Sequence, residues 1–447
     1  MKLTLVKPNI GTKNGKKYRD IASMEPYALA VIAGATPSDI EIQMFDDRIE
    51  EIDYDVPTDL AAITVGTYTA KRAYQIADQY RARGVPVVLG GFHASLIPDE
   101  ASKHADSVVV GEAEPVWKNV LDDLRAGKLK KIYQAGFKCN LAGLRPDRSI
   151  YNNKKYIPVT LTHFSRGCPY QCTFCPDGAL YEGSIRYRSV TDVVNDIAAQ
   201  SREFIFFVDT NISANKQKLK ELLRAIAPLK IKWFSQADIN IARDDELLKL
   251  LPKSGCSGLV VGFETLNMEN LKMMNKTQNV KVFDRYDELV SKIHDHGICM
   301  WGSFLLGYDS DTLDSFRYTL DFALKHKFFL AAFNPLIPFF GTPIYSQLEK
   351  EKRLLYDRWW IDSSYRFGLP LYQPKNMTPE QLYDGCADTL RKFTAFSSIF
   401  KRSANFKANL KSFFNFKAYF IYNLLYKREF EKKYLLKLGY ENDGDNI

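Results

Sequence analysis

The chain has 447 residues, of which 46% are hydrophobic and 26% are charged, and its formal net charge is +8. This composition is ordinary for a soluble globular protein with room for two or three domains. No stretch approaches the roughly 20 uninterrupted apolar residues of a membrane span, and the first residues contain no apolar run of signal-peptide length. Seven sparse cysteines argue against a disulfide framework, so we expect a cytoplasmic protein with reduced thiols.

The first 125 or so residues are predicted to alternate between strands and helices. Apolar runs such as KLTLV, DLAAITV and VPVVLGG are short enough for buried parallel strands, and helical stretches such as AKRAYQIADQYRARG separate them. This pattern indicates a doubly wound, Rossmann-like α/β domain over residues 1–135. Ligands of such sheets bind beyond the carboxyl ends of the strands.

Three loops at these strand ends have compositions suited to a binding site, namely GTYTA (66–70), GGFHAS (90–95) and GEAEP (111–115). Glycine at the end of a strand lets the backbone approach a ligand closely. The alternative for Gly90 and Gly91 is that they only form a tight turn. Because three such loops are expected at the same edge, we favour a ligand site there.

Residues 136–157 are basic and rich in turn-forming residues, so we predict a linker. From residue 158 to 345, six candidate strands including EFIFFVDT, SGLVVGFET and ICMWGSFLLG alternate with helical segments. This alternation predicts a partial (β/α)6 barrel with its chemistry at the carboxyl ends of the strands. Polar residues at these ends are candidate site residues: Asp209, Asn211, Gln236, Glu264 and Ser303.

Residues 346–447 are predicted to form a mostly helical C-terminal domain. An irregular aromatic segment, YDRWWIDSSYRFGLPLYQPKNM, comes first, and a long helical region begins near Thr378. There TPEQL supplies a helix cap, a proline at the first helical position and an early acidic residue.

The stretch SRGCPYQCTFCPDG places Cys168, Cys172 and Cys175 in the loop after the first barrel strand. Structural zinc would need a fourth ligand, but only His163 is near and no second Cys-x-x-Cys pair is present. A redox pair formed by Cys172 and Cys175 would leave Cys168 without a role. We therefore favour a [4Fe–4S] cluster with three cysteine ligands, whose open iron can bind a small bidentate ligand.

The spacing Cys168-x3-Cys172-x2-Cys175, with Phe174 before the third cysteine, resembles the signature of radical S-adenosylmethionine (SAM) enzymes. The N-terminal region, with EIQMFDDRIEEID and VPVVLGGFHASLIPDE, resembles the cobalamin-binding domain that precedes the barrel in one large subgroup. Downstream, FVDTNI, VGFETLN, GYDSDT and PFFGTPIY are also similar to that subgroup. The resemblance covers about residues 1–345.

The resemblance implies that SAM binds the open iron of the [4Fe–4S] cluster and is cleaved to a 5′-deoxyadenosyl radical. An external electron donor of the flavodoxin or ferredoxin type would reduce the cluster. Phe174 would flank the adenine, and Glu264 would hold the nucleoside or the amino end of SAM, with Asp209 and Gln236 as further pocket residues. The alternative for Glu264 is a buried salt bridge.

The resemblance also places cobalamin at the carboxyl edge of the N-terminal sheet. The motif Asp-x-His-x-x-Gly, whose histidine ligates cobalt in other cobalamin domains, is absent here. We therefore expect no imidazole below cobalt, where Tyr68 is the nearest candidate, and His93 is either a contact or a loop histidine bonded to backbone. The expected contacts are Thr67, Tyr68, Thr69, Gly90, Gly91, Phe92, His93, Gly111, Glu112 and Glu114.

The positive charge is concentrated in the tail, where residues 401–440 contain ten Lys or Arg and two Glu, a net of 10 − 2 = +8. Eleven Phe or Tyr are interleaved with them. A helical cap with its aromatic residues packed on the barrel is the first interpretation. Contact of the tail with a membrane surface is the second, and nucleic-acid binding is the least favoured.

Together these features predict a cobalamin-dependent radical SAM C-methyltransferase that acts on an unactivated carbon. The substrate could be a small molecule, a lipid or a peptide, because specificity in such barrels comes from loops and the C-terminal segment. A radical SAM enzyme for cyclisation, rearrangement or C–C coupling is the nearest alternative. A non-catalytic cobalamin-binding sensor is the alternative from another class.

Overall fold

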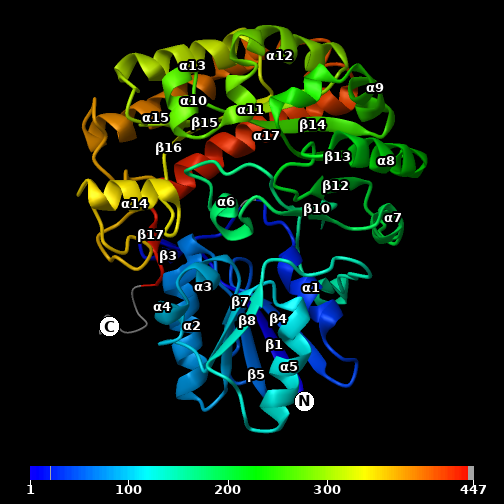
Figure 1. Ribbon diagram of the computed structural model, residues 1–447, viewed down its shortest axis with the longest axis vertical. Coiled ribbons are helices and arrows are strands. Elements are labelled where there is room, and N and C mark those ends of the chain that lie inside the picture. Colours follow the sequence, from blue (N-terminus) through cyan, green and yellow to red (C-terminus); the bar gives the residue numbers. More distant parts are fainter. Residues whose placement is uncertain (21, 441–447) are drawn as a thin grey trace. The chain divides into compact units, whose positions relative to one another are not determined.

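The computed structural model describes residues 1–20 and 22–440 and divides the chain into two compact units (Figure 1). Unit 1 comprises Met1–Ile157, Tyr356–Phe367 and Lys432–Ile447, and unit 2 comprises Pro158–Leu355 and Gly368–Glu431. The region 346–447, expected as one domain, is thus divided between the units. Its end, residues 441–447, lies outside the described residues.

Unit 1 is built on a six-stranded parallel sheet with the order β4-β1-β5-β6-β7-β8 (Figure 1). Its strands are β1 (Lys2–Lys7), β4 (Glu41–Asp46), β5 (Leu60–Thr64), β6 (Val87–Gly90), β7 (Ser107–Gly111) and β8 (Ile132–Gly136). Its helices are α1 (Tyr27–Ala35), α2 (Ala70–Ala82), α3 (Phe92–Leu96), α4 (Pro98–Ala101) and α5 (Glu114–Arg125). The predicted doubly wound α/β fold is therefore confirmed.

The core of unit 1 explains why the apolar runs form strands. Leu3, Leu60 and Val88 come from three different strands, are at most 2% exposed, and belong to one hydrophobic cluster with Trp117 of α5. Strands covered on both faces read as continuous apolar runs, which is the pattern seen in the sequence. The strand order reverses at β1, so the carboxyl ends of β1 and β5 lie at the switch point where such sheets bind ligands.

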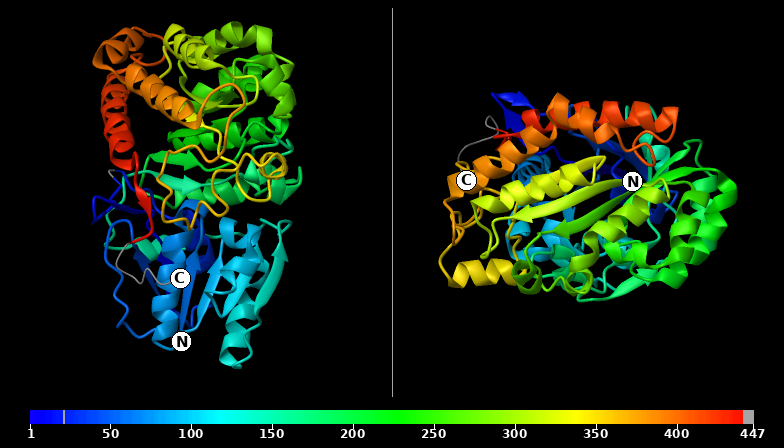
Figure 2. Two further views of the ribbon diagram at one scale, coloured as in Figure 1. Left: turned by 90° about the vertical axis from the view of Figure 1, so that its left-hand side faces the viewer. Right: turned by 90° about the horizontal axis from the view of Figure 1, so that it is seen from above.

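Two segments from the end of the chain complete unit 1. Strand β17 (Lys437–Leu438) pairs antiparallel with β2 (Gly11–Lys13), which pairs with β3 (Lys16–Lys17); Figure 2 shows this red strand beside the blue N-terminal strands. Next to β17, the Tyr440 hydroxyl lies 3.2 Å from an oxygen of Asp47. Residues 437–440 are therefore held by strand pairing and by a part-buried polar contact.

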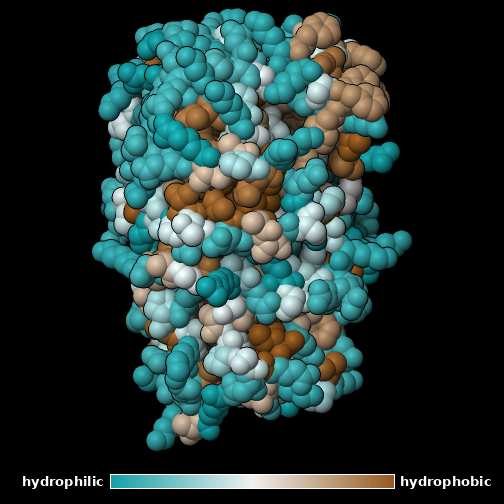
Figure 3. Space-filling view, turned by 90° about the vertical axis from the view of Figure 1, so that its right-hand side faces the viewer, coloured by the Kyte–Doolittle hydropathy of each residue, from teal (hydrophilic) through white to brown (hydrophobic). Residues whose placement is uncertain are grey.

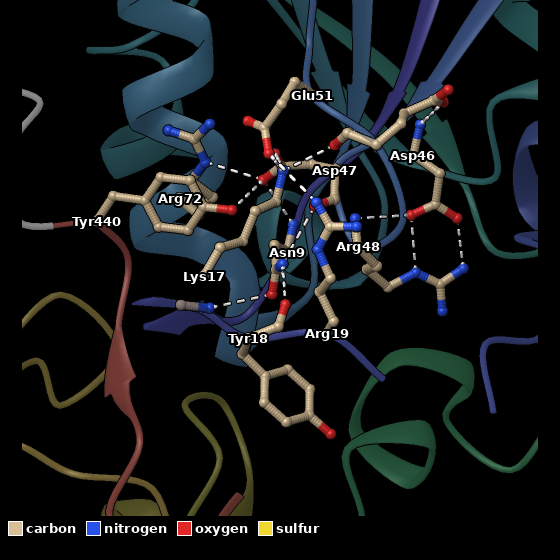
Figure 4. A network of polar contacts seen from close by, with 12 residues as sticks. Asn9, Lys17, Tyr18, Arg19, Asp46, Asp47, Arg48, Glu51, Arg72 and Tyr440 are labelled. Atoms are coloured by element: carbon tan, nitrogen blue, oxygen red, sulfur yellow. Dashed lines mark hydrogen bonds and ion pairs between the residues drawn. The ribbon is translucent and has the colours of Figure 1, made fainter. Parts of the chain in front are cut away.

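Asp47 is the centre of this polar network (Figure 4). Its carboxylate lies 2.9 Å from both Lys17 Nζ and Arg72 Nε, and it accepts a hydrogen bond from the Asn9 amide. Arg72 lies 3.8 Å from the centre of the Tyr440 ring. Burial alone would raise the pKa of Asp47, but the hydrogen bond and charge of Arg72, joined by Lys17, outweigh it and lower the pKa below its usual value.

Unit 2 is built on a second six-stranded parallel sheet, with the order β16-β15-β14-β13-β12-β9. The strands are β9 (Thr160–Thr162), β12 (Phe204–Phe207), β13 (Lys232–Ala237), β14 (Cys256–Glu264), β15 (Cys299–Leu306) and β16 (Leu330–Pro335). Helices α7 (Val190–Ala198), α8 (Lys216–Ile226), α9 (Asp245–Lys253), α12 (Tyr286–Asp295) and α13 (Leu313–Lys325) lie between them in sequence. This confirms the predicted partial barrel.

Among the described residues, four helices of eight or more residues follow the barrel: α14 (Pro343–Lys350), α15 (Pro379–Phe393), α16 (Phe396–Ser403) and α17 (Phe413–Lys433) (Figure 2). As predicted, α15 begins after Thr378, whose side chain and that of Gln381 form a reciprocal capping box. Among the described residues, no helix combines the length and apolar character needed to cross a membrane.

Replacing Asp47 with Asn should destabilise the protein by about 3 kcal/mol, because Arg72 and Lys17 would be left without their buried counter-charge. Thermal unfolding of the full chain measures this as a lower midpoint. Glu51→Gln, which alters a side chain that is 75% exposed, is the matched control. Since the folded-state pKa of Asp47 is lowered, its contribution is present above a pH of about 4 and is lost below it. An unchanged midpoint for Asp47→Asn at neutral pH would contradict this role.

Candidate functional site

The three cysteines lie in one loop that is held at its start and in its middle. The loop runs from β10 (Ser165–Gly167) to α6 (Pro176–Tyr181). At its start, the buried carboxylate of Asp209 accepts hydrogen bonds from the backbone amide of Phe164 at 2.9 Å and from the amide and hydroxyl of Ser165 at 2.5 and 2.6 Å. Asp209 follows β12, so the barrel strands fix where the cysteine loop begins.

A second loop from the barrel holds the middle of the cysteine loop. The Thr173 amide donates to the Met274 carbonyl at 3.0 Å, and the Asn275 side chain donates to the Gln171 carbonyl at 2.9 Å. The segment that contains Met274 and Asn275 follows α10 (Met268–Met273). These contacts bring a region about 100 residues away in sequence against the cysteines.

The thiols are largely enclosed in protein. Cys168 and Cys172 are each 8% exposed, and Cys175 is partly buried. Burial raises the pKa of Cys168 to about 11 and that of Cys175 to about 12. Among the described residues, no group of three or more His, Cys, Asp or Glu is placed to hold a single metal ion. A [4Fe–4S] cluster does not need its ligands to converge on one metal ion, because each thiolate binds a different iron of the cluster.

Lys276 supplies positive charge beside the thiols. Its ammonium group is hydrogen-bonded to Glu264, and it lies 5.7 Å from the centre of the Phe174 ring. Burial alone would lower the pKa of Lys276, but the charge of Glu264, followed by that of Cys172, raises it above its usual value. A cation here favours the thiolate forms that a metal cluster needs.

Glu264 closes β14 with a backbone φ of 64°, a left-handed conformation that is rare for this residue type. Such conformations cluster at functional sites, where the surrounding structure holds them in place. The buried salt bridge considered as the alternative for Glu264 is present, with Lys276 as the partner. Sequence reasoning missed Lys276, because nothing in LKMMNKTQ distinguishes it from an exposed lysine.

The other candidates occupy different environments. Phe174 is half-buried in the cysteine loop and Gln236 is exposed on β13, whereas Asp209 is completely buried. Burial raises the pKa of Asp209 to about 6, although hydrogen bonds from Ser165 and from backbone amides oppose it. Asn211 bonds to Asp238 and to Ser213, in a polar cluster of its own.

One face of the barrel sheet carries half-buried apolar side chains. Burial alternates along β12 and β13, so Phe206 and Phe234 share this face while their neighbours are buried on the other. Their rings stack at 4.4 Å with planes 8° apart. Trp301 and Leu305 are half-buried on β15 in the same alternation. On this face, Phe204 and Trp301 pack against Phe414 and Tyr426 of α17. Phe206, Phe234 and Leu305 supply its other apolar side chains.

In unit 1, the three predicted loops follow the adjacent strands β5, β6 and β7, as expected. The buried hydroxyl of Thr67 has no hydrogen-bond partner among the described residues, and such a group usually points to a missing ligand or water. Gly111 has a φ of 103°, and a Cβ there would lie 2.2 Å from the Gly136 carbonyl oxygen. Close backbone packing therefore requires glycine at this position.

The aromatic segment 356–367 packs against two of the predicted contact residues. Tyr68 has its ring centre 4.9 Å from Trp359 and 5.1 Å from Phe367, and burial raises its pKa. His93 is 1% exposed and lies edge-on to Trp360. Sequence reasoning missed this segment's place in unit 1, although its density of aromatic residues was a signal.

Glu100 explains the environment of His93. One of its carboxylate oxygens accepts hydrogen bonds from Trp360 at 2.8 Å and from Tyr74 at 2.9 Å, and it lies 3.4 Å from His93 Nε2. A histidine that serves only the loop was expected to bond to backbone. Here the Nε2 atom of the His93 ring lies next to the Glu100 carboxylate instead. The position of His93 is therefore fixed by a buried network.

Comparisons with known proteins agree with the fold and the cysteine loop. The sequence model of the radical SAM superfamily matches residues 162–323. Bacteriochlorophyllide d C-12(1)-methyltransferase from Chlorobaculum tepidum is 33% identical over 407 residues, which cover 88% of this chain and 87% of the relative. Anaerobic magnesium-protoporphyrin IX monomethyl ester cyclase from Cereibacter sphaeroides is 25% identical over 390 residues, covering 79% and 62%.

Among solved structures, the radical SAM methyltransferase TsrM from Kitasatospora setae, with cobalamin and a [4Fe–4S] cluster bound, matches with a TM-score of 0.63. The match covers 78% of this chain and 75% of TsrM at 19% identity, so it supports the shared fold. The chain belongs to the radical SAM superfamily, in the family of the Chlorobaculum methyltransferase, and its barrel follows a Rossmann-like domain in sequence. It is accordingly an enzyme.

Replacing Asp209 with Ala should loosen the start of the cysteine loop, because two backbone amides and one hydroxyl would lose their buried acceptor. We expect a lower midpoint of thermal unfolding and a reduced iron content per chain after anaerobic reconstitution, although all three cysteines remain. Glu203→Gln, at an exposed position before β12, is the control. Full iron loading of Asp209→Ala would show that the loop does not need this anchor.

Proposed function

We propose that this enzyme methylates a carbon atom of a large, hydrophobic, unsaturated ring substrate of the tetrapyrrole kind. It would use a [4Fe–4S] cluster, SAM and cobalamin. Support for the ring substrate comes from the names of the relatives described above, which act on bacteriochlorophyllide d and on magnesium-protoporphyrin IX monomethyl ester. The half-buried aromatic face around Phe206 and Phe234 suits such a molecule, because aromatic surfaces stack on flat rings.

The observation that carries the proposal is the cysteine loop held against Lys276 and Glu264. Cys168, Cys172 and Cys175 would hold the cluster, and Phe174 would flank the adenine of SAM. When bound, the cluster supplies the electron that cleaves SAM. Glu264, kept in place by Lys276, offers a carboxylate for the amino end or the nucleoside of SAM. The enclosure of the thiols limits access of water to this chemistry.

In unit 1, the residues that follow β5, β6 and β7 fit a cobalamin site. The unpaired buried hydroxyl of Thr67 offers a hydrogen bond to the cofactor, and Gly66 and Gly90, where a Cβ would meet no atom closer than 3.6 Å, leave room for its close approach. Tyr68 is enclosed by aromatic rings, and His93 is engaged in the network of Glu100. Neither arrangement supplies a free imidazole, which fits the expectation that no imidazole lies below cobalt.

Turnover provides the direct test. With reductant, SAM and a tetrapyrrole acceptor, S-adenosylhomocysteine and 5′-deoxyadenosine should form in comparable amounts, because one SAM supplies the methyl group and a second supplies the radical. Cys172→Ala should abolish formation of 5′-deoxyadenosine and leave the cobalamin content unchanged. Deoxyadenosine without S-adenosylhomocysteine, in protein with stoichiometric cobalt, would instead indicate ring formation of the kind named for the cyclase relative.

Replacing Lys276 with Gln should raise the KM for SAM about 10-fold or more, because a charge-assisted hydrogen bond contributes about 1.5–3 kcal/mol. Loss of the cation also disfavours the thiolates, so the iron content of the variant is measured and SAM binding is expressed per loaded cluster. Equilibrium dialysis of SAM against the reconstituted, unreduced protein measures binding apart from turnover. Lys272→Gln, on the exposed side of α10, is the control. Unchanged SAM affinity in Lys276→Gln would exclude a positioning role for the Glu264–Lys276 pair.

A further inference from the structure

Helix α17 has an unusual distribution of polar and apolar residues. Its buried residues are Asn415, Tyr419 and Asn423, which are four positions apart and therefore share one face. On other faces, Phe413 is 71% exposed and Ile421 is 52% exposed. A surface helix normally does the opposite, burying its apolar face and exposing its polar one.

Specific hydrogen bonds within unit 2 fix this orientation. The Asn415 side chain donates to the Ala408 carbonyl at 2.9 Å, and the Asn423 side chain donates to the Phe329 carbonyl at 3.0 Å. The Tyr419 hydroxyl donates to the Ile399 carbonyl at 2.7 Å. Rotating the helix to bury its phenylalanines would leave these buried carbonyls without donors, which is costly. The outward position of the apolar residues is therefore built into the fold.

The exposed apolar residues extend from α17 onto α16. Among the described residues, nine of the fourteen exposed large hydrophobic side chains fall between residues 396 and 424. Figure 3 shows hydrophobic side chains gathered at its upper right, over the C-terminal helices. We call this the 396–424 surface, formed by Phe396, Phe400, Phe406, Phe413, Phe414, Phe416, Ile421, Tyr422 and Leu424. Large apolar patches of this kind mark sites of interaction with a protein or a membrane.

The positive charge of this part of the chain distinguishes between a protein and a membrane as the partner. From Thr389 to Arg428 the chain has nine Lys or Arg and no Asp or Glu. Lys401 and Lys417 are exposed within the 396–424 surface, and the Lys417 ammonium lies 4.4 Å from the centre of the Phe413 ring. Lysine is depleted in protein–protein interfaces, whereas lysine mixed with exposed aromatic residues is typical of helices that lie on anionic lipid.

We propose that the 396–424 surface binds an anionic phospholipid bilayer. The phenylalanines would enter the boundary between headgroups and acyl chains, and Lys401 and Lys417 would face lipid phosphates. The contact is peripheral, in keeping with the absence of a spanning helix among the described residues. The helical-cap interpretation of the tail describes Phe414, Tyr419 and Tyr426, whose rings pack on Phe204, Phe329 and Trp301. It does not describe the more exposed side chains, such as Phe400 and Phe413. This proposal does not depend on the identity of the substrate.

Vesicle sedimentation with the full chain tests the proposal. Wild-type protein should sediment with vesicles of phosphatidylcholine and phosphatidylglycerol, and less with phosphatidylcholine alone or at high salt. The triple variant Phe400→Ser, Phe413→Ser and Ile421→Ser should lose about 100-fold in partitioning, because three large apolar contacts with lipid are removed. The double variant Leu313→Ser and Tyr318→Ser, which removes exposed apolar residues of α13, is the control and should bind as wild type does.

A second variant keeps the test decisive if the triple variant folds poorly. Lys401→Glu with Lys417→Glu retains every apolar residue and should weaken binding only to vesicles that contain phosphatidylglycerol. SAM cleavage should remain at the wild-type level in both variants. The proposal is overturned if wild-type protein binds neither kind of vesicle. It is equally overturned if the triple variant binds the vesicles as well as wild type does. It is also overturned if the triple substitution changes only the oligomeric state, since a second copy would then be the partner.

Discussion

The parallel pairing of β9, β12, β13, β14, β15 and β16 is the constraint on which the site in unit 2 depends. In a parallel sheet every strand ends on the same side, so the loop that follows each strand opens at one shared edge. The cysteine loop follows β9, Asp209 follows β12, and Glu264 ends β14. The helix-facing side of the sheet, with Ile205 and Leu259 almost fully buried, holds the strands in this register.

In both units a buried carboxylate is paired with a buried cationic side chain. Asp47 is surrounded by Lys17 and Arg72, and Glu264 is paired with Lys276. Removing one member of such a set leaves an uncompensated charge in the interior, which costs far more than the loss of a surface ion pair. The two sets differ in surroundings. The first ties the returning end of the chain to unit 1, whereas the second lies beside cysteine thiols, where its charge bears on their chemistry.

Helices α8 and α17 show how differently a helix face can be used. Helix α8 buries Leu219, Leu222, Leu223 and Ile226, the usual apolar stripe, and its polar residues face outward. Helix α17 buries asparagines that satisfy strand-end and loop carbonyls, and it is left with phenylalanines outside. An exposed apolar surface of this kind is typical of a site that a partner covers.

The sequence by itself determined both sheets, the order of helices and strands and the cysteine loop, because these follow from local periodicity and from a spacing within eight residues. It also located the three glycine-containing loops of unit 1, since strand ends are readable from apolar runs. The pairing of Glu264 with Lys276 and the return of residues 356–367 and 432–440 to unit 1 came only from the tertiary structure. So did the outward face of α17. The periodicity of a sequence indicates that a residue is buried, but not which distant group it contacts. Lys276 contacts Glu264, Trp360 contacts Glu100 and Asn423 contacts the Phe329 carbonyl, and only the folded chain brings these groups together.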